Sequence, residues 1–145
     1  MIEFINVDIY LNCVVIAAGI SVEDFDDLYE RNKDKFSYGE YKQIRNDIEN
    51  EKSCNGLTST LDCGNIFVFI RKGQERKDLT VAHELYHATN RLLFRAGVNH
   101  DEDDEPFAYL DAWLTNEYYN RLDDFENEQQ EQEENERQDV EVSKE

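Results

Sequence analysis

The segment that most restricts the fold of this chain is residues 80–88, which reads T-V-A-H-E-L-Y-H-A. It places His83 and His87 four positions apart, with Glu84 directly after the first histidine. In an α-helix, residues four apart lie on one face, one turn from each other. The surrounding positions are mostly apolar, which predicts a helix buried on several sides. Two imidazoles on one face can point at a single metal ion, and Glu84 beside them can reach a water bound to that ion.

This spacing is the H-E-x-x-H pattern, in which two histidines bind zinc and the glutamate is the general base of a metallopeptidase. The chain has three histidines in all, so two of them fall in the pattern. The alternative is a surface helix with two ordinary histidines, but so apolar a helix has little surface to offer. The pattern therefore predicts a Zn²⁺ site with His83 and His87 as ligands and Glu84 as the catalytic base.

Length and charge limit the other possibilities. A chain of 145 residues is long enough for one domain with a modest core. A net charge of -19 and a pI near 4.4 argue against nucleic acid and anionic membranes as partners. Cys13, Cys54 and Cys63 are odd in number and irregular in spacing, which is typical of a reducing compartment rather than a disulfide framework. We find no signal-peptide pattern and no apolar run long enough to span a membrane.

The elements before the motif can be placed from periodicity. Residues 4–17 alternate between apolar and polar, which predicts one long N-terminal strand. Ser21 and Ser37 each precede an acidic residue three positions on, so we expect both to begin helices. Residues 56–72 read as a β-hairpin around Gly64, whose stronger strand is I-F-V-F-I at residues 66–70. We therefore expect an α+β fold in which a small, mostly antiparallel sheet packs on the motif helix.

The elements after the hairpin complete that expectation. Asp78 can cap the motif helix, and Gly97 is placed to end it. A last helix is expected at residues 105–122, with Pro106 acceptable in its first turn. One stripe of this helix consists of Glu105 and two alanines, and we expect the motif helix to dock there. Residues 123–145 hold eleven acidic and two basic residues, so we divide the chain into a domain at 1–122 and a disordered acidic tail at 123–145.

A catalytic zinc ion usually has three protein ligands. The spacing that would supply a third histidine directly after the motif is absent, because Asn90 and Leu93 occupy the relevant positions. Glu105, 18 residues after His87 at the start of the next helix, is the expected third ligand. The alternatives lie in the preceding loop: first Glu102 and His100, then Asp101, Asp103 and Asp104.

A strand, the motif helix, a short loop and then E-P-F-A-Y-L-D-A-W-L resemble the gluzincin-type zinc metallopeptidases. More narrowly, the chain resembles small H-E-x-x-H proteins encoded by bacteriophages and bacterial mobile elements. The resemblance covers residues 56–122 and implies a minimal zincin-like domain with His83, His87 and Glu105 as zinc ligands and Glu84 as base. It also implies that a peptide substrate lies along the strand Ile66–Ile70 by strand addition. A cytoplasmic, non-secreted protein of a bacterium or phage-infected cell is expected, with its oligomeric state left open.

In such an enzyme, Glu84 takes the proton of a zinc-bound water and hands it to the leaving amine. A second electrophile usually helps to hold the oxyanion, and Tyr109 and Tyr86 are candidates for that role. Asp111 is a candidate for orienting a ligand histidine. The competing readings are a non-catalytic zincin-fold binding or regulatory module and a phage structural component, each with vestigial or structural zinc.

Overall fold

The computed structural model describes residues 1–7, 12–50, 55–73, 77–100 and 104–142 of the chain. They form an α+β fold, as expected. The described elements in chain order are β1 (Ile2–Val7), β2 (Asn12–Ala18), α1 (Val22–Arg31), α2 (Tyr38–Glu49), β3 (Gly56–Thr60), β4 (Ile66–Ile70), α3 (Lys77–Arg95) and α4 (Glu105–Val142).

The four described strands form one mixed sheet in the order β1-β2-β4-β3. β1 pairs antiparallel with β2, β2 pairs parallel with β4, and β4 pairs antiparallel with β3. The single strand expected at residues 4–17 is therefore wrong, because the chain folds back so that Ile2 faces Ala17 and Val7 faces Asn12. β3 and β4 are five residues long. A strand of twice that length would have left its apolar side chains beyond the ends of its neighbours. The two shorter strands keep them covered.

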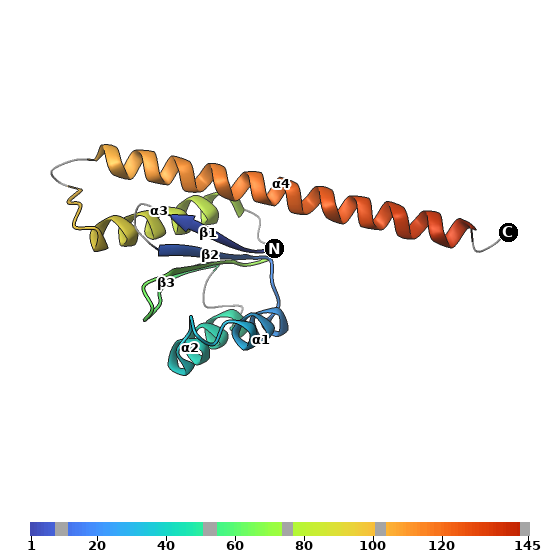
Figure 1. Cartoon of the computed structure of the whole chain (residues 1–145), viewed down its shortest axis with the longest axis horizontal. Helices are drawn as coiled ribbons and strands as arrows, with labels where there is room; N and C mark the ends of the chain where they lie inside the picture. Colours follow the sequence, from blue (N-terminus) through green and yellow to red (C-terminus); the bar gives the residue numbers. More distant parts are fainter. Residues whose placement is uncertain (8–11, 51–54, 74–76, 101–103, 143–145) are drawn as a thin grey trace.

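Both faces of the sheet are buried, because helices cover each of them (Figure 1). Alternate residues of the central strands point to opposite sides. One face packs against α3 and α4 and contributes Val14, Ile16, Ile66 and Val68. The other packs against α1 and α2 and contributes Val15, Ala17, Phe67 and Phe69. The result is three layers, with β2 and β4 at the centre.

The helix ends follow the sequence signals closely. Ser21 and Ser37 each form a complete capping box at the start of α1 and α2. Gly97 follows α3 with φ of 78°, and the amide of Val98 donates to the carbonyl of Leu93. This pair of features is a Schellman ending, in which glycine takes the left-handed conformation without steric cost. Asp78 does not cap α3 from outside, because the helix begins at Lys77 and Asp78 lies in its first turn.

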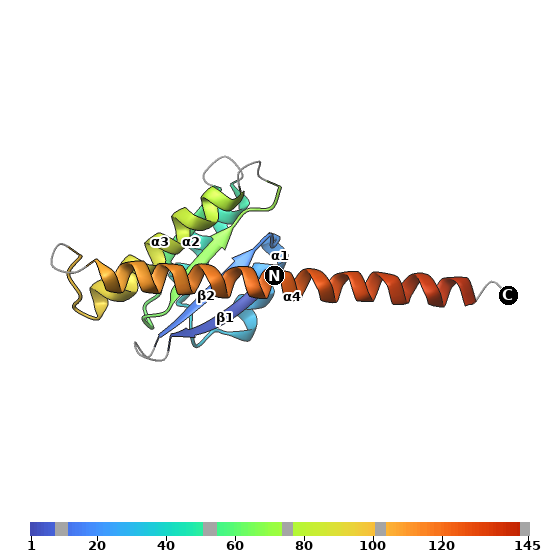
Figure 2. The ribbon, with the colours of Figure 1, turned by 90° about the horizontal axis from the view of Figure 1, so that it is seen from above.

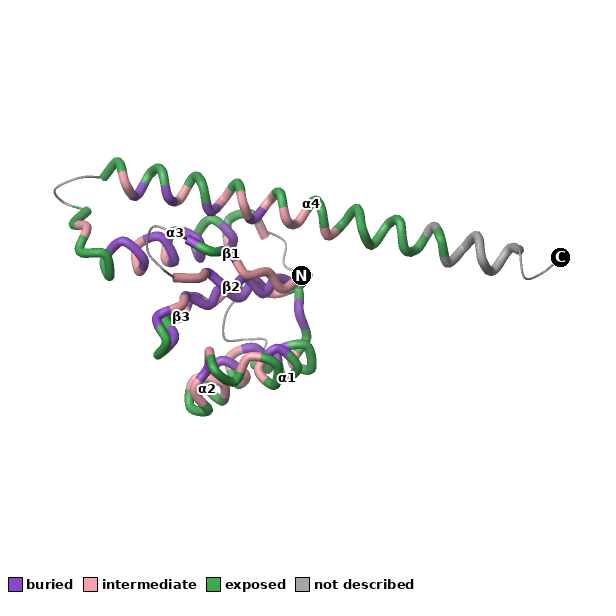
Figure 3. The backbone as a smooth tube through the Cα atoms, in the orientation of Figure 1, coloured by how far each residue is buried: buried purple, intermediate pink, exposed green. Residues whose placement is uncertain are grey.

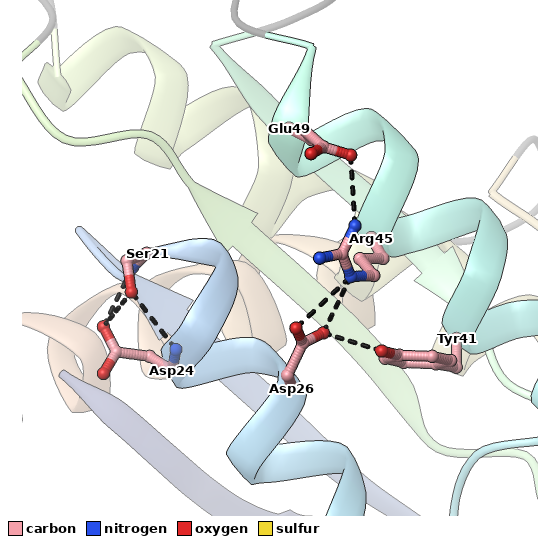
Figure 4. Close-up of polar contacts among 6 residues, drawn as sticks. All are labelled: Ser21, Asp24, Asp26, Tyr41, Arg45 and Glu49. Atoms are coloured by element: carbon pink, nitrogen blue, oxygen red, sulfur yellow. Dashed lines mark hydrogen bonds and ion pairs between the residues drawn. The ribbon is translucent and has the colours of Figure 1, made fainter.

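A polar cluster fixes α1 to α2 (Figure 4). The Tyr41 hydroxyl donates to Oδ1 of Asp26 at 2.7 Å, and Nε of Arg45 donates to the same oxygen at 2.9 Å. Arg45 also pairs with Glu49 one turn further along α2, at 3.1 Å. These contacts hold the helix pair that covers the far side of the sheet from α3.

Helix α4 is longer than the sequence predicts. It continues through residue 142 instead of ending near Leu122, so the structure extends a helix through most of the segment for which the sequence predicts disorder. Glutamate, glutamine and arginine are good helix formers, and no glycine or proline follows Pro106. Figure 2 shows α4 crossing the strands and projecting well past them. No helix among the described residues is long and apolar enough to cross a membrane.

Candidate metal centre

The two histidines of the motif meet on the outer face of α3. Their Nε2 atoms are 3.1 Å apart, and the rings are nearly perpendicular, with centroids 4.5 Å apart. His83 is exposed and His87 is half-buried. Two nitrogen ligands of a tetrahedral zinc ion, each about 2.0–2.1 Å from the metal, stand about 3.3 Å apart. The pair therefore fits two ligand positions of one zinc ion, although the same separation also suits a hydrogen bond between imidazoles.

Glu84 points from α3 toward the edge strand β3 and is only 6 % exposed. The hydroxyl of Thr58 lies 2.6 Å from its Oε2 atom and 3.0 Å from its main-chain carbonyl oxygen. A carboxylate needs such partners when it is removed from water. Sequence reasoning missed Thr58, because a threonine in an alternating strand carries no sign of what it faces.

Helix and strand approach so closely here because residue 56 is glycine. A Cβ atom at Gly56 would lie 2.7 Å from Cγ of Glu84 and 2.7 Å from Cγ2 of Thr80. Any side chain at that position would overlap the side chains of Glu84 and Thr80, which would have to move. A pocket of about 390 Å³ opens at this contact, lined by Asn55, Gly56, Leu79, Thr80, His83 and Glu84. The motif glutamate and the first motif histidine thus border the same pocket.

Glu105 is not brought to the histidine pair. It shares the exposed stripe of α4 with Ala108 and Ala112. The expected docking of α3 on that stripe is wrong, because α4 buries its large apolar residues in the core instead: Phe107, Leu110, Leu114 and Tyr118. Figure 3 shows buried positions recurring along the first part of α4. Burying these large side chains removes far more apolar surface from water than burying two alanines would.

The register of the two helices separates Glu105 from the pair along the axis as well. Thr89 on α3 donates to Asp111 on α4 at 3.4 Å, and Tyr119 on α4 donates to Asp78 on α3 at 3.2 Å. The helices are therefore antiparallel, and Glu105 lies level with the C-terminal end of α3. Measured along the helix axis, that position lies roughly 10 Å from His87, at a rise of 1.5 Å per residue. Within the part of the chain that the structure describes, no three His, Cys, Asp or Glu residues are grouped to hold a metal ion.

The structure describes only some of the alternative third ligands. Glu102, Asp101 and Asp103 lie outside the described residues. His100 is described, and its ring packs on Phe107 with centroids 4.4 Å apart. It lines a separate pocket of about 520 Å³ at the C-terminal end of α3.

The residues expected to hold the oxyanion or to orient a ligand histidine do not all lie beside the motif histidines. Tyr109 is 74 % exposed on α4 and does not line the pocket beside Glu84. The ring centroid of Tyr86 lies 6.3 Å from that of His87. Asp111 bonds Thr89, on the side of α3 that faces α4, and so does not orient a motif histidine. Burial raises the pKa of the Asp111 carboxyl, and the hydrogen bond from Thr89 partly opposes that shift.

The expected substrate strand is also misplaced. Ile66–Ile70 is β4, which pairs with β2 on one side and β3 on the other, so it has no free edge. The edge of the described sheet next to α3 is β3. A continuous apolar run is typical of an enclosed strand, and I-F-V-F-I follows that rule.

Three comparisons with known proteins give no relative. No protein-family model, no curated protein and no solved structure matches the chain.

Proposed function

We propose that this chain is a zinc-dependent peptidase of minimal zincin-like fold, with His83 and His87 as metal ligands and Glu84 as general base. The observation that carries the proposal is the convergence of the two Nε2 atoms to 3.1 Å on one face of α3. Glu84 lies between them in sequence and borders the same pocket as His83. A pair of neutral nitrogen donors next to a carboxylate is the chemistry that zinc hydrolysis uses.

A bound zinc ion would supply a Lewis acid that acidifies water and polarises a carbonyl oxygen. The protein groups divide the remaining work. The imidazoles of His83 and His87 would hold the metal. The carboxylate of Glu84 accepts a proton from the attacking water and then delivers it to the leaving amine nitrogen. Tyr86, beside His87, is better placed than Tyr109 to donate a hydrogen bond to the developing oxyanion.

The substrate of this proposal is a peptide or protein in extended conformation. β3 pairs with β4 along one side, and its other side is the edge of the described sheet. An extended peptide can add to such an edge through main-chain hydrogen bonds. The residues of β3 that face α3 lie against Glu84. A peptide on this edge would run past the pocket that Glu84 borders.

A second candidate is a binding or regulatory module that uses the same fold. The observation that favours it is the outward position of Glu105, on the exposed stripe of α4. In this second candidate no further protein group completes the histidine pair, and the chain does not retain zinc through dialysis. In this case the acidic surface of the chain would contact a basic partner.

Metal content and cleavage together test the proposal. Purified protein is loaded with zinc, dialysed and analysed by mass spectrometry, and then incubated with dye-quenched casein. We expect one zinc per chain and measurable cleavage, both lost in His83→Ala and both kept in the matched control His100→Ala. Glu84→Gln should keep the zinc and lose the cleavage. Cleavage by Glu84→Gln at the rate of the unmodified protein, with zinc bound, would refute the proposal and favour the binding module.

A further inference from the structure

We propose that Thr58 is a positioning residue for the reaction, holding one carboxylate oxygen of Glu84 so that the other faces the pocket. This inference rests on the proposed function, because it assigns a partner to the proposed base. Thr58 belongs to the edge strand β3, and Glu84 belongs to α3, 26 positions later. The contact therefore connects the substrate-binding edge to the base.

The contact has the properties of a strong hydrogen bond. Thr58 and Glu84 are 7 % and 6 % exposed, so bulk water hardly competes for either group. Their oxygens are 2.6 Å apart, a separation typical of a hydroxyl donating to a charged carboxylate. The second neighbour of the hydroxyl is the main-chain carbonyl oxygen of Glu84, at 3.0 Å, which can only accept. The hydroxyl therefore donates its single hydrogen, and Oε2 is the nearer acceptor.

The other side of the carboxylate is bounded by Gly56. Residues two apart on a strand face the same side, so Gly56 and Thr58 both face α3. The Oε1 atom of Glu84 lies 2.9 Å from where a Cβ atom of Gly56 would stand. Gly56 lines the pocket and Thr58 does not. Oε2 is therefore the oxygen that is held, and Oε1 is the one on the pocket side.

A glutamate base benefits from such a partner, because its side chain has several freely rotating bonds. A general base displaced by about an ångström from its productive position loses much of its effect on the rate. Loss of the hydroxyl should therefore lower the turnover rate roughly 10- to 100-fold. Zinc binding depends on the histidines and should not change.

The test compares two substitutions at one position. Thr58→Val keeps the shape and removes the hydroxyl, whereas Thr58→Ser keeps the hydroxyl and removes a methyl group. Thr60→Val is the matched control, because Thr60 lies on the same strand and is exposed. Zinc content and the urea unfolding midpoint are measured for each variant. The saturated rate of casein cleavage is measured as well. The last measurement is the calorimetric affinity for acetohydroxamate, a zinc chelator whose N–H and O–H groups can donate to a neighbouring carboxylate.

We expect Thr58→Val to keep zinc but lose the rate and bind acetohydroxamate more weakly, with most of both restored in Thr58→Ser. Adding Thr58→Val to Glu84→Gln should cause little further loss of acetohydroxamate affinity, since the two residues then act as one unit. Full activity in Thr58→Val, equal losses in the valine and serine variants, or additive losses in the double variant would each overturn the inference. If the unmodified protein binds no zinc and cleaves nothing, both proposals fail. If the unmodified protein cleaves casein and Thr58→Val cleaves it equally well, only the inference about Thr58 fails.

Discussion

The Nε2 atoms of His83 and His87 lie 3.1 Å apart on the outer face of α3, close to the separation that a shared zinc ion requires. Glu105, the third ligand expected from spacing, lies instead on the exposed stripe of α4. We expect Glu105→Ala to retain zinc and His87→Ala to lose it, as measured by mass spectrometry after dialysis. Loss of zinc in Glu105→Ala would mean that the start of α4 turns toward the pair when metal binds.

Gly56 is the position at which helix and strand are most sensitive to added volume. We expect Gly56→Ala to destabilise the fold by about 1–3 kcal/mol, because the new methyl group overlaps Cγ of Glu84. Gly39→Ala is the matched control: it adds the same methyl group in α2, where the nearest atom is 4.0 Å away. Helix propensity should make that control neutral or stabilising by up to about 1 kcal/mol. Urea unfolding of the two variants decides, and equal midpoints would contradict the close packing of β3 on α3.

The Asp111 carboxyl should lower the stability of the folded chain at neutral pH but not in acid. Burial raises the pKa of its carboxyl above the ordinary 3.8, so the ionised form is penalised in the folded state and that penalty fades as pH falls through the raised pKa. We expect Asp111→Asn to stabilise the protein near neutral pH by up to about 1 kcal/mol, since the side chain remains partly solvated. The gain should vanish below pH 3.8. A gain in unfolding free energy that is constant with pH would point to packing instead of charge.

Asp26 should behave in the opposite direction. The hydrogen bond from Tyr41, with a further contribution from Arg45, lowers the pKa of the Asp26 carboxyl. Its ionised form therefore stabilises the fold above the ordinary pKa of 3.8, and that stabilisation is lost as pH falls through the lowered value. We expect Asp26→Asn to cost less than about 1 kcal/mol at neutral pH, since the cluster is a third exposed. Matched urea titrations near neutral pH and in acid check the sign, and a loss that persists in acid would exclude the charge as its cause.

The parts of this fold that sequence reasoning places correctly are those fixed by local chemistry. Ser21, Ser37 and Gly97 act on backbone groups within a few residues, so their roles can be read from the chain alone. The hairpin around Gly64 and the burial of the I-F-V-F-I strand follow in the same way. These signals do not depend on what the rest of the molecule does.

The parts that sequence reasoning misplaces depend on competition between distant segments. Residues 4–17 alternate whether they form one strand or two, and only the length of the neighbouring strands decides between them. Either stripe of α4 could pack against the rest of the fold. The stripe of larger side chains does so, because it buries more apolar area. That rotation of α4 moves Glu105 away from the motif. Thr58 could not be found at all, because its importance comes from a residue on another element.

The parallel pairing at the centre of the sheet has a consequence for how the chain folds. Each edge pair joins strands close in sequence, whereas the central register joins Val14 to Ile66 and so encloses two helices and a strand between its partners. Bringing the ends of such a long segment together has an entropic cost, which must be met before the contacts between β2 and β4 form. We expect the two edge pairs to form early and the central pairing to limit the folding rate. Folding kinetics that slow markedly in Val14→Ala and little in Thr60→Ala would show it, and the reverse order would exclude it. Thr58 and Glu84 both follow β2 in the chain, only 26 positions apart, so their contact can form before the central pairing closes.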